Sequence, residues 1–170
     1  MQGWLGYALL TVVCWGVYGV FLHNGAMGMQ DPVNGRLKAF VMVGVAYFLV
    51  AILAPSALLW ARGATFTFPS GGLGWSLVAG VVGAVGALGV LLAFGAKGPP
   101  AVVMSLVFGL APIVNALVST WKAGTWGDIR WQFVVGIAMA ATGGGMVSLY
   151  RPETPPPRAD VSPGTAGQAP

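Results

Sequence analysis

PPAVVMSLVFGLAPIVNALVSTW, residues 99–121, is the stretch that decides the fold of this chain. It holds no charged residue, and at ~1.5 Å per residue in a helix it is long enough to cross a hydrocarbon layer of ~30 Å. Pro112 lies near its middle and cannot donate to the carbonyl of Phe108, so we expect a bend there. The stretch therefore predicts a kinked transmembrane helix.

Polar side chains share one face of this predicted helix with the proline. At helical spacing the face carries Ser105, Phe108, Pro112, Asn115 and Ser119. It should look toward protein or a cavity rather than toward lipid. Two roles remain open, which are hydrogen bonding between helices and the lining of a substrate site. The small residues Ala101, Ser105 and Gly109 suit the first role, because they allow close helix packing.

The composition predicts an integral membrane protein. Hydrophobic residues make up 56% of the 170 residues and charged residues 7%, and the mean hydropathy is +0.80. Soluble domains carry about 25% charged residues. The Lys and Arg residues stand singly between apolar runs, so the net charge of +4 creates no basic face and nucleic acid is not an expected partner.

Few residues could carry catalysis or ligate a metal. The chain has one cysteine, Cys14, and one histidine, His23. Its four acidic residues all lie in predicted loops or in the tail. Paired carboxylates, a histidine cluster or an activated nucleophile cannot be built from this set. We therefore expect no enzyme, no catalytic residue, no metal and no cofactor.

Hydropathy divides the chain into five apolar runs and a tail. The predicted spans are about 3–22, 37–60, 71–95, 99–121 and 129–150, and the proline-rich segment 151–170 is expected to be disordered. Pro55 predicts a kink or last turn in the second span, and Asp128 is expected to cap the fifth. Six of the seven tryptophans lie near ends of the runs, as membrane interfaces favour. The fold class is an all-α integral membrane bundle of five helices.

Glycine and alanine recur at four-residue spacing in the third and fifth spans. Ala79, Gly83 and Ala87 form one such face, and Gly136, Ala140 and Gly144 form another. Membrane helices use small residues to bring their backbones close together. These faces predict helix–helix contacts.

The first span carries a stripe of semi-polar and aromatic side chains, formed by Trp4, Tyr7, Thr11, Cys14 and Tyr18. A stripe of this kind is buried against other helices or faces a pore. With the polar face of the central helix, it yields the candidate substrate-lining set: Asn115, Pro112, Tyr18, Trp15, Tyr47, Cys14 and Ser105.

Five spans put the two termini on opposite sides of the membrane. Arg62, Lys122 and Arg130 fall on the N-terminal side, and five basic residues fall on the other: Arg36, Lys38, Lys97, Arg151 and Arg158. The count favours a cytoplasmic C-terminus. The bias is small enough that insertion in both orientations, and pairing as an inverted dimer, stays open.

Three features together resemble the EamA-like unit of the drug/metabolite transporter superfamily. They are Trp15-Gly16 in the first span, AKGPPAVVMSLVFGLAPIVNALVS with Pro112 mid-helix, and GIAMAATGGGMVSL from Gly136 to Leu149. The resemblance implies a five-helix unit, half of a ten-helix inverted-repeat transporter, that works as a homodimer. Gly127-Asp128 stands where family members usually have Gly-Glu, and no acidic residue lies in the first span.

The resulting hypothesis is a transporter subunit in the inner or plasma membrane. A homodimer would move a small metabolite or drug-like solute by alternating access. Without a carboxylate at membrane depth, we expect facilitated passage, exchange or neutral oxygen ligands rather than coupling through an acid. The alternative is a non-transporting membrane subunit that stabilises a larger complex, with the proline-rich tail as its docking segment.

Overall fold

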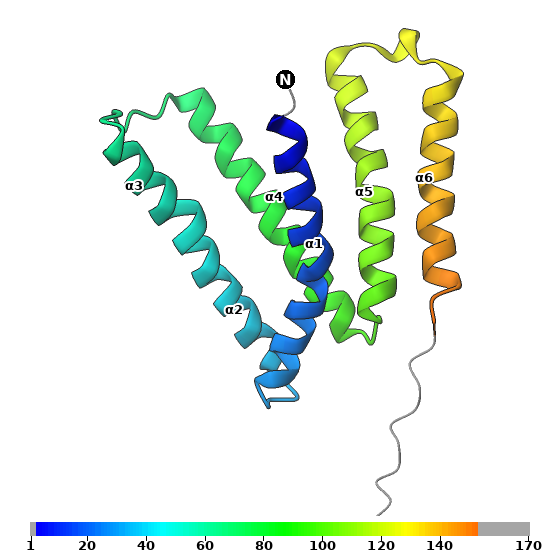
Figure 1. Ribbon diagram of the computed structural model, residues 1–170, viewed down its shortest axis with the longest axis horizontal. Coiled ribbons are helices and arrows are strands. Elements are labelled where there is room, and N and C mark those ends of the chain that lie inside the picture. The colour runs from blue at the N-terminus through cyan, green and yellow to red at the C-terminus, as the bar shows by residue number, and fades with distance from the viewer. Residues whose placement is uncertain (1–2, 153–170) are drawn as a thin grey trace, which may run out of the picture.

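The computed structural model describes residues 3–152, and every regular element in this range is helical (Figure 1). The elements are α1 (Gly3–Gly28), α2 (Gly35–Tyr47), the π-helix η1 (Phe48–Leu53), α3 (Ala54–Ala61), α4 (Ser70–Gly95), α5 (Pro100–Ala123), the 3₁₀ turn η2 (Trp126–Asp128) and α6 (Trp131–Leu149). α2, η1 and α3 run on without a break. Five helices are thus long and apolar enough to span a membrane, which confirms the predicted five-helix, multi-pass class.

Two helix ends differ from the sequence-based boundaries. α1 continues to Gly28 rather than ending at Leu22, because no proline interrupts the chain until Pro32. The prediction that Asp128 caps the last helix is wrong. Asp128 belongs to η2, Ile129 is extended, and α6 follows Arg130 without a side-chain cap. The predicted tail lies outside the described residues from position 153 on.

The two mid-span prolines have different effects on their helices. Pro55 follows the π-helical turn, in which the amide of Ala54 donates to the carbonyl of Leu49. The wider turn accommodates a proline ring that would clash with the carbonyl four residues back in a regular α-helix. α5 instead continues as one helix through Pro112.

The best-packed region lies where α1, α2 and α4 meet, near the α1–α2 and α4–α5 loops. Its buried residues are Leu22, Ala39, Ala87, Val90, Leu91 and Phe94. Gly19 of α1 adjoins Met104 of α5 there, and a Cβ at Gly19 would lie 2.5 Å from the Met104 Cγ. Toward the other end of the bundle α2–η1–α3 leans away from α1 (Figure 1), and η1 and α3 contain no buried residue.

α5 and α6 form the closest helix pair, running side by side in Figure 1. A Cβ built on Gly109 would lie 3.1 Å from the Cα of Gly144, and the reverse distance is the same. A Cβ on Gly144 would also lie 3.3 Å from the carbonyl oxygen of Ser105. The small-residue faces predicted on the fourth and fifth spans therefore meet each other, backbone against backbone.

The small-residue face of α4 makes a helix contact only at one end. Ala87 is buried where α1, α2 and α4 meet, whereas Ala79 and Gly83 are exposed. Cβ atoms built on Gly80, Gly83, Gly86 and Gly89 would meet nothing within 4 Å, so this face has no backbone contact like that between α5 and α6.

Six tryptophans gather at one end of the bundle. Because successive spans alternate in direction, the starts of α1, α4 and α6 and the ends of α3 and α5 share the end of the bundle where α1 begins (Figure 1). The six are Trp4, Trp60, Trp75, Trp121, Trp126 and Trp131, each at least half exposed. Arg62, Lys122 and Arg130 lie at this end too, and the Lys122 Nζ sits 5.5 Å from the centre of the Trp75 ring. The basic residues predicted for the other side of the membrane lie at the opposite end of the bundle: Arg36, Lys38, Lys97 and Arg151. Arg158 is outside the described range.

Candidate functional site

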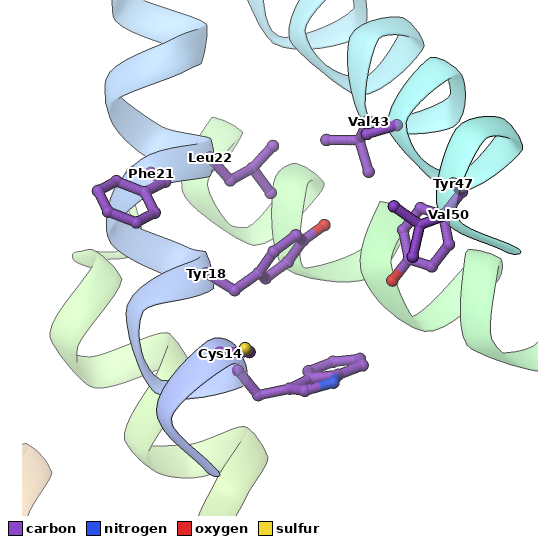
Figure 2. A pocket seen from close by; sticks show the side chains of 9 residues that line it. Cys14, Tyr18, Phe21, Leu22, Val43, Tyr47 and Val50 are labelled. Atoms are coloured by element: carbon purple, nitrogen blue, oxygen red, sulfur yellow. The ribbon is translucent and has the colours of Figure 1, made fainter. Parts of the chain in front are cut away.

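A cavity of about 560 Å³ separates α1 from α2 and η1, and we call it the α1–α2 cavity (Figure 2). It is lined by Cys14, Trp15, Tyr18, Phe21 and Leu22 of α1 and by Val43, Ala46, Tyr47 and Val50 of the facing span. In Figure 2 the ring of Tyr18 extends from α1 into the space between the helices, with Tyr47 and Val50 on the other side. A cavity of this size can hold a drug-sized solute.

Side-chain spacing on both helices explains why the lining faces inward. Cys14, Tyr18 and Leu22 recur every four residues and therefore share one face of α1. Across the cavity, Tyr47 ends α2 and Val50 lies in the π-helical turn of η1. A π-helical turn changes the direction of the side chains that follow it, and such turns are frequent at functional sites. Pro55 is the residue in the sequence that favours this turn.

None of the nine lining residues carries a charge. Their polar groups are the hydroxyls of Tyr18 and Tyr47, the indole N–H of Trp15 and the thiol of Cys14. The Tyr18 hydroxyl is buried and has no hydrogen-bond partner among the described residues. Leaving a hydroxyl unpaired in an apolar medium costs about 1–3 kcal/mol.

Four other hydroxyls of the spans are satisfied inside their own helices. Thr11, Thr120, Thr142 and Ser148 each donate to the carbonyl four residues back, at 2.8–3.0 Å. A phenolic hydroxyl lies too far from its own backbone to do so. Tyr18 therefore needs a partner from outside its helix.

A second cavity, of about 450 Å³, lies on the other side of the same aromatic residues, and we call it the α4–α5 cavity. Trp15 and Tyr18 line it as well, together with Gly83, Gly86 and Phe108 among others. The Trp15 ring centre is 5.8 Å from that of Tyr18 and 6.2 Å from that of Phe108, the latter edge to face. Trp15 and Tyr18 thus form a partition shared by the two cavities.

The structure brings four of the seven predicted lining residues together. Cys14, Trp15, Tyr18 and Tyr47 all line the α1–α2 cavity. Asn115 and Pro112 lie exposed on α5, outside both cavities, and Ser105 lies at the α5–α6 crossing. Sequence reasoning missed the apolar lining residues, Phe21, Leu22, Val43, Ala46 and Val50. They look like any other apolar residue of a span, so no chemical signal singled them out.

A third cavity, of about 430 Å³, lies at the end of the bundle that carries the α1–α2 loop. His23, Asp31 and Arg36 contribute to its lining. Asp31 Oδ2 accepts a 2.6 Å bond from Lys38 Nζ, and Oδ1 accepts the amides of Val33 and Asn34. The Lys38 bond and then these amides lower the pKa of Asp31 to about 2. These bonds fix the α1–α2 turn, which makes Asp31 a structural residue.

Within residues 3–152, no three His, Cys, Asp or Glu side chains gather in a way that could hold a metal ion. Comparison with protein-family models, with curated proteins and with solved structures finds no significant match to this chain. Any function must therefore be inferred from the cavities themselves.

Proposed function

We propose that this protein is a transporter subunit that moves a small metabolite or drug-like solute by alternating access. The observation that carries the proposal is the α1–α2 cavity, whose lining includes an unpaired hydroxyl halfway along a membrane-spanning helix. Lipid chains cannot satisfy a hydrogen-bonding group at that depth, whereas a solute or water can.

The partition between the two cavities suggests how access would alternate. Trp15 and Tyr18 separate the α1–α2 cavity from the α4–α5 cavity. A change in the tilt of α2–η1–α3, which is anchored only at its α2 end, would open or close the first cavity. Rocking of one helix group against another is the usual motion of alternating access.

We propose a homodimer as the working unit, in line with the resemblance to the five-helix unit of the drug/metabolite transporter superfamily. The exposed Ala79 and Gly80 of α4 and the exposed Asn115 of α5 are the surfaces that a second copy would cover. We place the dimer in the cell membrane, with the end that carries Arg36, Lys38 and Lys97 in the cytoplasm. Insertion in both orientations would make the dimer inverted.

The chain contains its own probe of this proposal. Cys14 is the single cysteine, is exposed and lines the α1–α2 cavity. In proteoliposomes, a permanently charged methanethiosulfonate reagent should modify Cys14, because the thiol ionises and reacts only where water reaches it. The matched control is a cysteine at Val13 in a Cys14→Ala background. Val13 is 63% exposed, one residue away, and lines neither cavity.

The proposal predicts that the rate of modification at position 14 exceeds that at position 13 by about tenfold or more, as for a water-filled site compared with a lipid-facing one. Equal, slow rates at both positions would contradict it. That outcome would favour the alternative, a membrane subunit whose cavity is filled by lipid or by a partner protein.

A further inference from the structure

We infer that the ligand of the α1–α2 cavity is an uncharged molecule with a compact aromatic or branched apolar body and a hydrogen-bond acceptor, which binds the hydroxyl of Tyr18. This inference rests on the proposed function and names the substrate class. Three observations support it: the charge of the lining, its shape and apolar character, and the unpaired donor.

Charge comes first. The nine lining residues include no Asp, Glu, Lys, Arg or His, and the described acidic residues lie in the loops. An ion that binds against this lining, with the water displaced, would lack a counter-charge, and the cost of a charge near the bilayer centre is about 2.5–3.5 kcal/mol or more. A ring face of Trp15 or Tyr18 returns about 0.5–2 kcal/mol to a cation. The cost of the unpaired charge exceeds the gain from the aromatic rings, so a neutral ligand is favoured over a cation and over an anion.

The shape of the lining selects the apolar body. Phe21, Leu22, Val43, Ala46 and Val50 supply hydrocarbon surface around the cavity. Trp15 and Tyr18 add aromatic faces, tilted by 43° to each other with ring centres 5.8 Å apart. Flat aromatic or branched aliphatic groups match such walls. A solute covered in hydroxyl groups would leave most of them without partners.

The acceptor follows from Tyr18. Its hydroxyl is enclosed and lacks a partner, while Figure 2 shows the ring directed toward the facing span that carries Tyr47. Once a rotation of the Tyr18 side chain brings the hydroxyl, which protein atoms cover in this structure, to the cavity surface, a carbonyl, ether or hydroxyl oxygen on the ligand would accept this bond. Discrimination by a buried donor is strong, because an analogue without the acceptor leaves the hydroxyl unpaired.

A pair of photoreactive ligands of nearly equal shape tests the inference. The first is 4-neopentylbenzophenone, which is uncharged. The second is (4-benzoylbenzyl)trimethylammonium, in which a cationic nitrogen replaces the quaternary carbon. Both carry the same acceptor carbonyl and cross-link on illumination. Each is added to the full-length protein in lipid nanodiscs, and the labelled peptides are identified by mass spectrometry.

We expect the neutral ligand to label peptides of α1 and α2–η1 that contain the lining residues, at least about tenfold more than the cation does. Tyr18→Phe removes the donor and should reduce this labelling about tenfold. Tyr7→Phe is the matched control. Tyr7 is on the same helix, 74% exposed and outside both cavities, so its replacement should leave the labelling unchanged.

Two outcomes would overturn the inference. Preferred labelling of the cavity by the cation would assign it to charged ligands, and labelling unaffected by Tyr18→Phe would remove the hydroxyl from recognition. Either result leaves the Cys14 test untouched, so a water-filled transport cavity for another solute class would still stand. Conversely, strong neutral labelling with an unreactive Cys14 would show a binding site and contradict transport.

Discussion

The α5–α6 pair and the α1–α2 pair are both antiparallel hairpins of apolar helices, yet one is closed and the other is hollow. At Gly109 and Gly144 two glycines face each other, and the backbones touch. Between α1 and α2–η1, Tyr18 and Tyr47 stand on opposite walls of a cavity of about 560 Å³. Small residues at a crossing let helices close, whereas bulky aromatic residues hold them apart.

The two hairpins also differ in the helix geometry next to their prolines. α5 carries Pro112 as part of one continuous helix, against α6 along its length. The second span has a π-helical turn directly before Pro55, and α2–η1–α3 as a whole leans away from α1 (Figure 1). η1 and α3 contain no buried residue, whereas α2 packs against α1 and α4. In the proposed transport we therefore expect η1 and α3 to move and the α5–α6 hairpin to stay fixed.

The largest expected effect comes from breaking the closed hairpin. Gly144→Val should lower the free energy of unfolding by about 2–3 kcal/mol, because its Cβ meets the Gly109 Cα and the Ser105 carbonyl oxygen. Gly145→Val is the control, since a Cβ there meets nothing within 4 Å. Circular dichroism in mixed micelles titrated with SDS measures both. Equal losses in the two variants would show that the hairpin does not depend on the glycine contact.

Pro55→Ala should alter the hollow hairpin without unfolding it. Alanine can donate to the carbonyl of Ala51, so we expect the π-helical turn of η1 to revert to an α-helix and to reorient Tyr47 and Val50. Labelling by 4-neopentylbenzophenone should fall about tenfold, equivalent to about 1.4 kcal/mol of binding. Pro69→Ala, just before α4, should have no effect. Unchanged labelling in Pro55→Ala would separate the cavity from the π-helical turn.

Asn115→Leu decides whether the polar face of α5 belongs to the solute site or to the dimer. Since Asn115 is exposed and outside both cavities, we expect the substitution to raise the dissociation constant of the proposed dimer about threefold. This is the loss expected from one hydrogen bond between membrane helices. Cavity labelling should stay the same. Sedimentation equilibrium in density-matched micelles measures the dimer, with Val114→Leu as control. Loss of labelling with an intact dimer would return Asn115 to the solute pathway.

The smallest effect concerns the turn that joins α1 to α2. The folded-state pKa of Asp31 is about 2, below its ordinary value of 3.8. Its contribution to stability is therefore present above pH 4 and lost as the pH falls from 4 toward 2. Hydrogen exchange at the amides of Val33 and Asn34, corrected for its intrinsic pH dependence, should show protection disappearing over this interval. Lys38→Met should move the loss to higher pH, and an unshifted transition would contradict the Lys38 contribution.

Periodicity and composition were sufficient for the coarse architecture. The five spans follow from apolar runs of membrane length, and the small-residue faces with Gly109 and Gly144 indicated helix contacts, although the sequence did not show that these two faces meet each other. The extra turns of α1 and the start of α6 could not be predicted. Helix ends near an interface depend on local backbone geometry, such as the extended Ile129, more than on hydropathy.

Only the aromatic and thiol-bearing residues of the cavity lining could be predicted from the sequence. Tyr18 and Cys14 stand out because semi-polar residues are rare in a span. Val43 and Ala46 resemble lipid-facing residues and need the fold to identify them as lining. Asn115 satisfied the same chemical criterion as Tyr18, but in the single chain Asn115 lies exposed on α5. Chemistry alone does not distinguish a cavity wall from an uncovered helix face.

Alternating access requires that the α1–α2 cavity open to both sides of the membrane, and thiol labelling can measure this. A charged thiol reagent is added only outside sealed proteoliposomes that hold the native Cys14 protein. Parallel samples carry cysteines at Asn34 or Ala64 in a Cys14→Ala background, which mark the two opposite ends of the bundle. The labelled fractions at these two markers should add up to the whole population, whatever the orientation of insertion.

If the cavity opens alternately to both sides, external reagent will in time modify Cys14 in every molecule. A labelled fraction at Cys14 that stops at the value of either marker would show access from one side only, and would contradict alternating access.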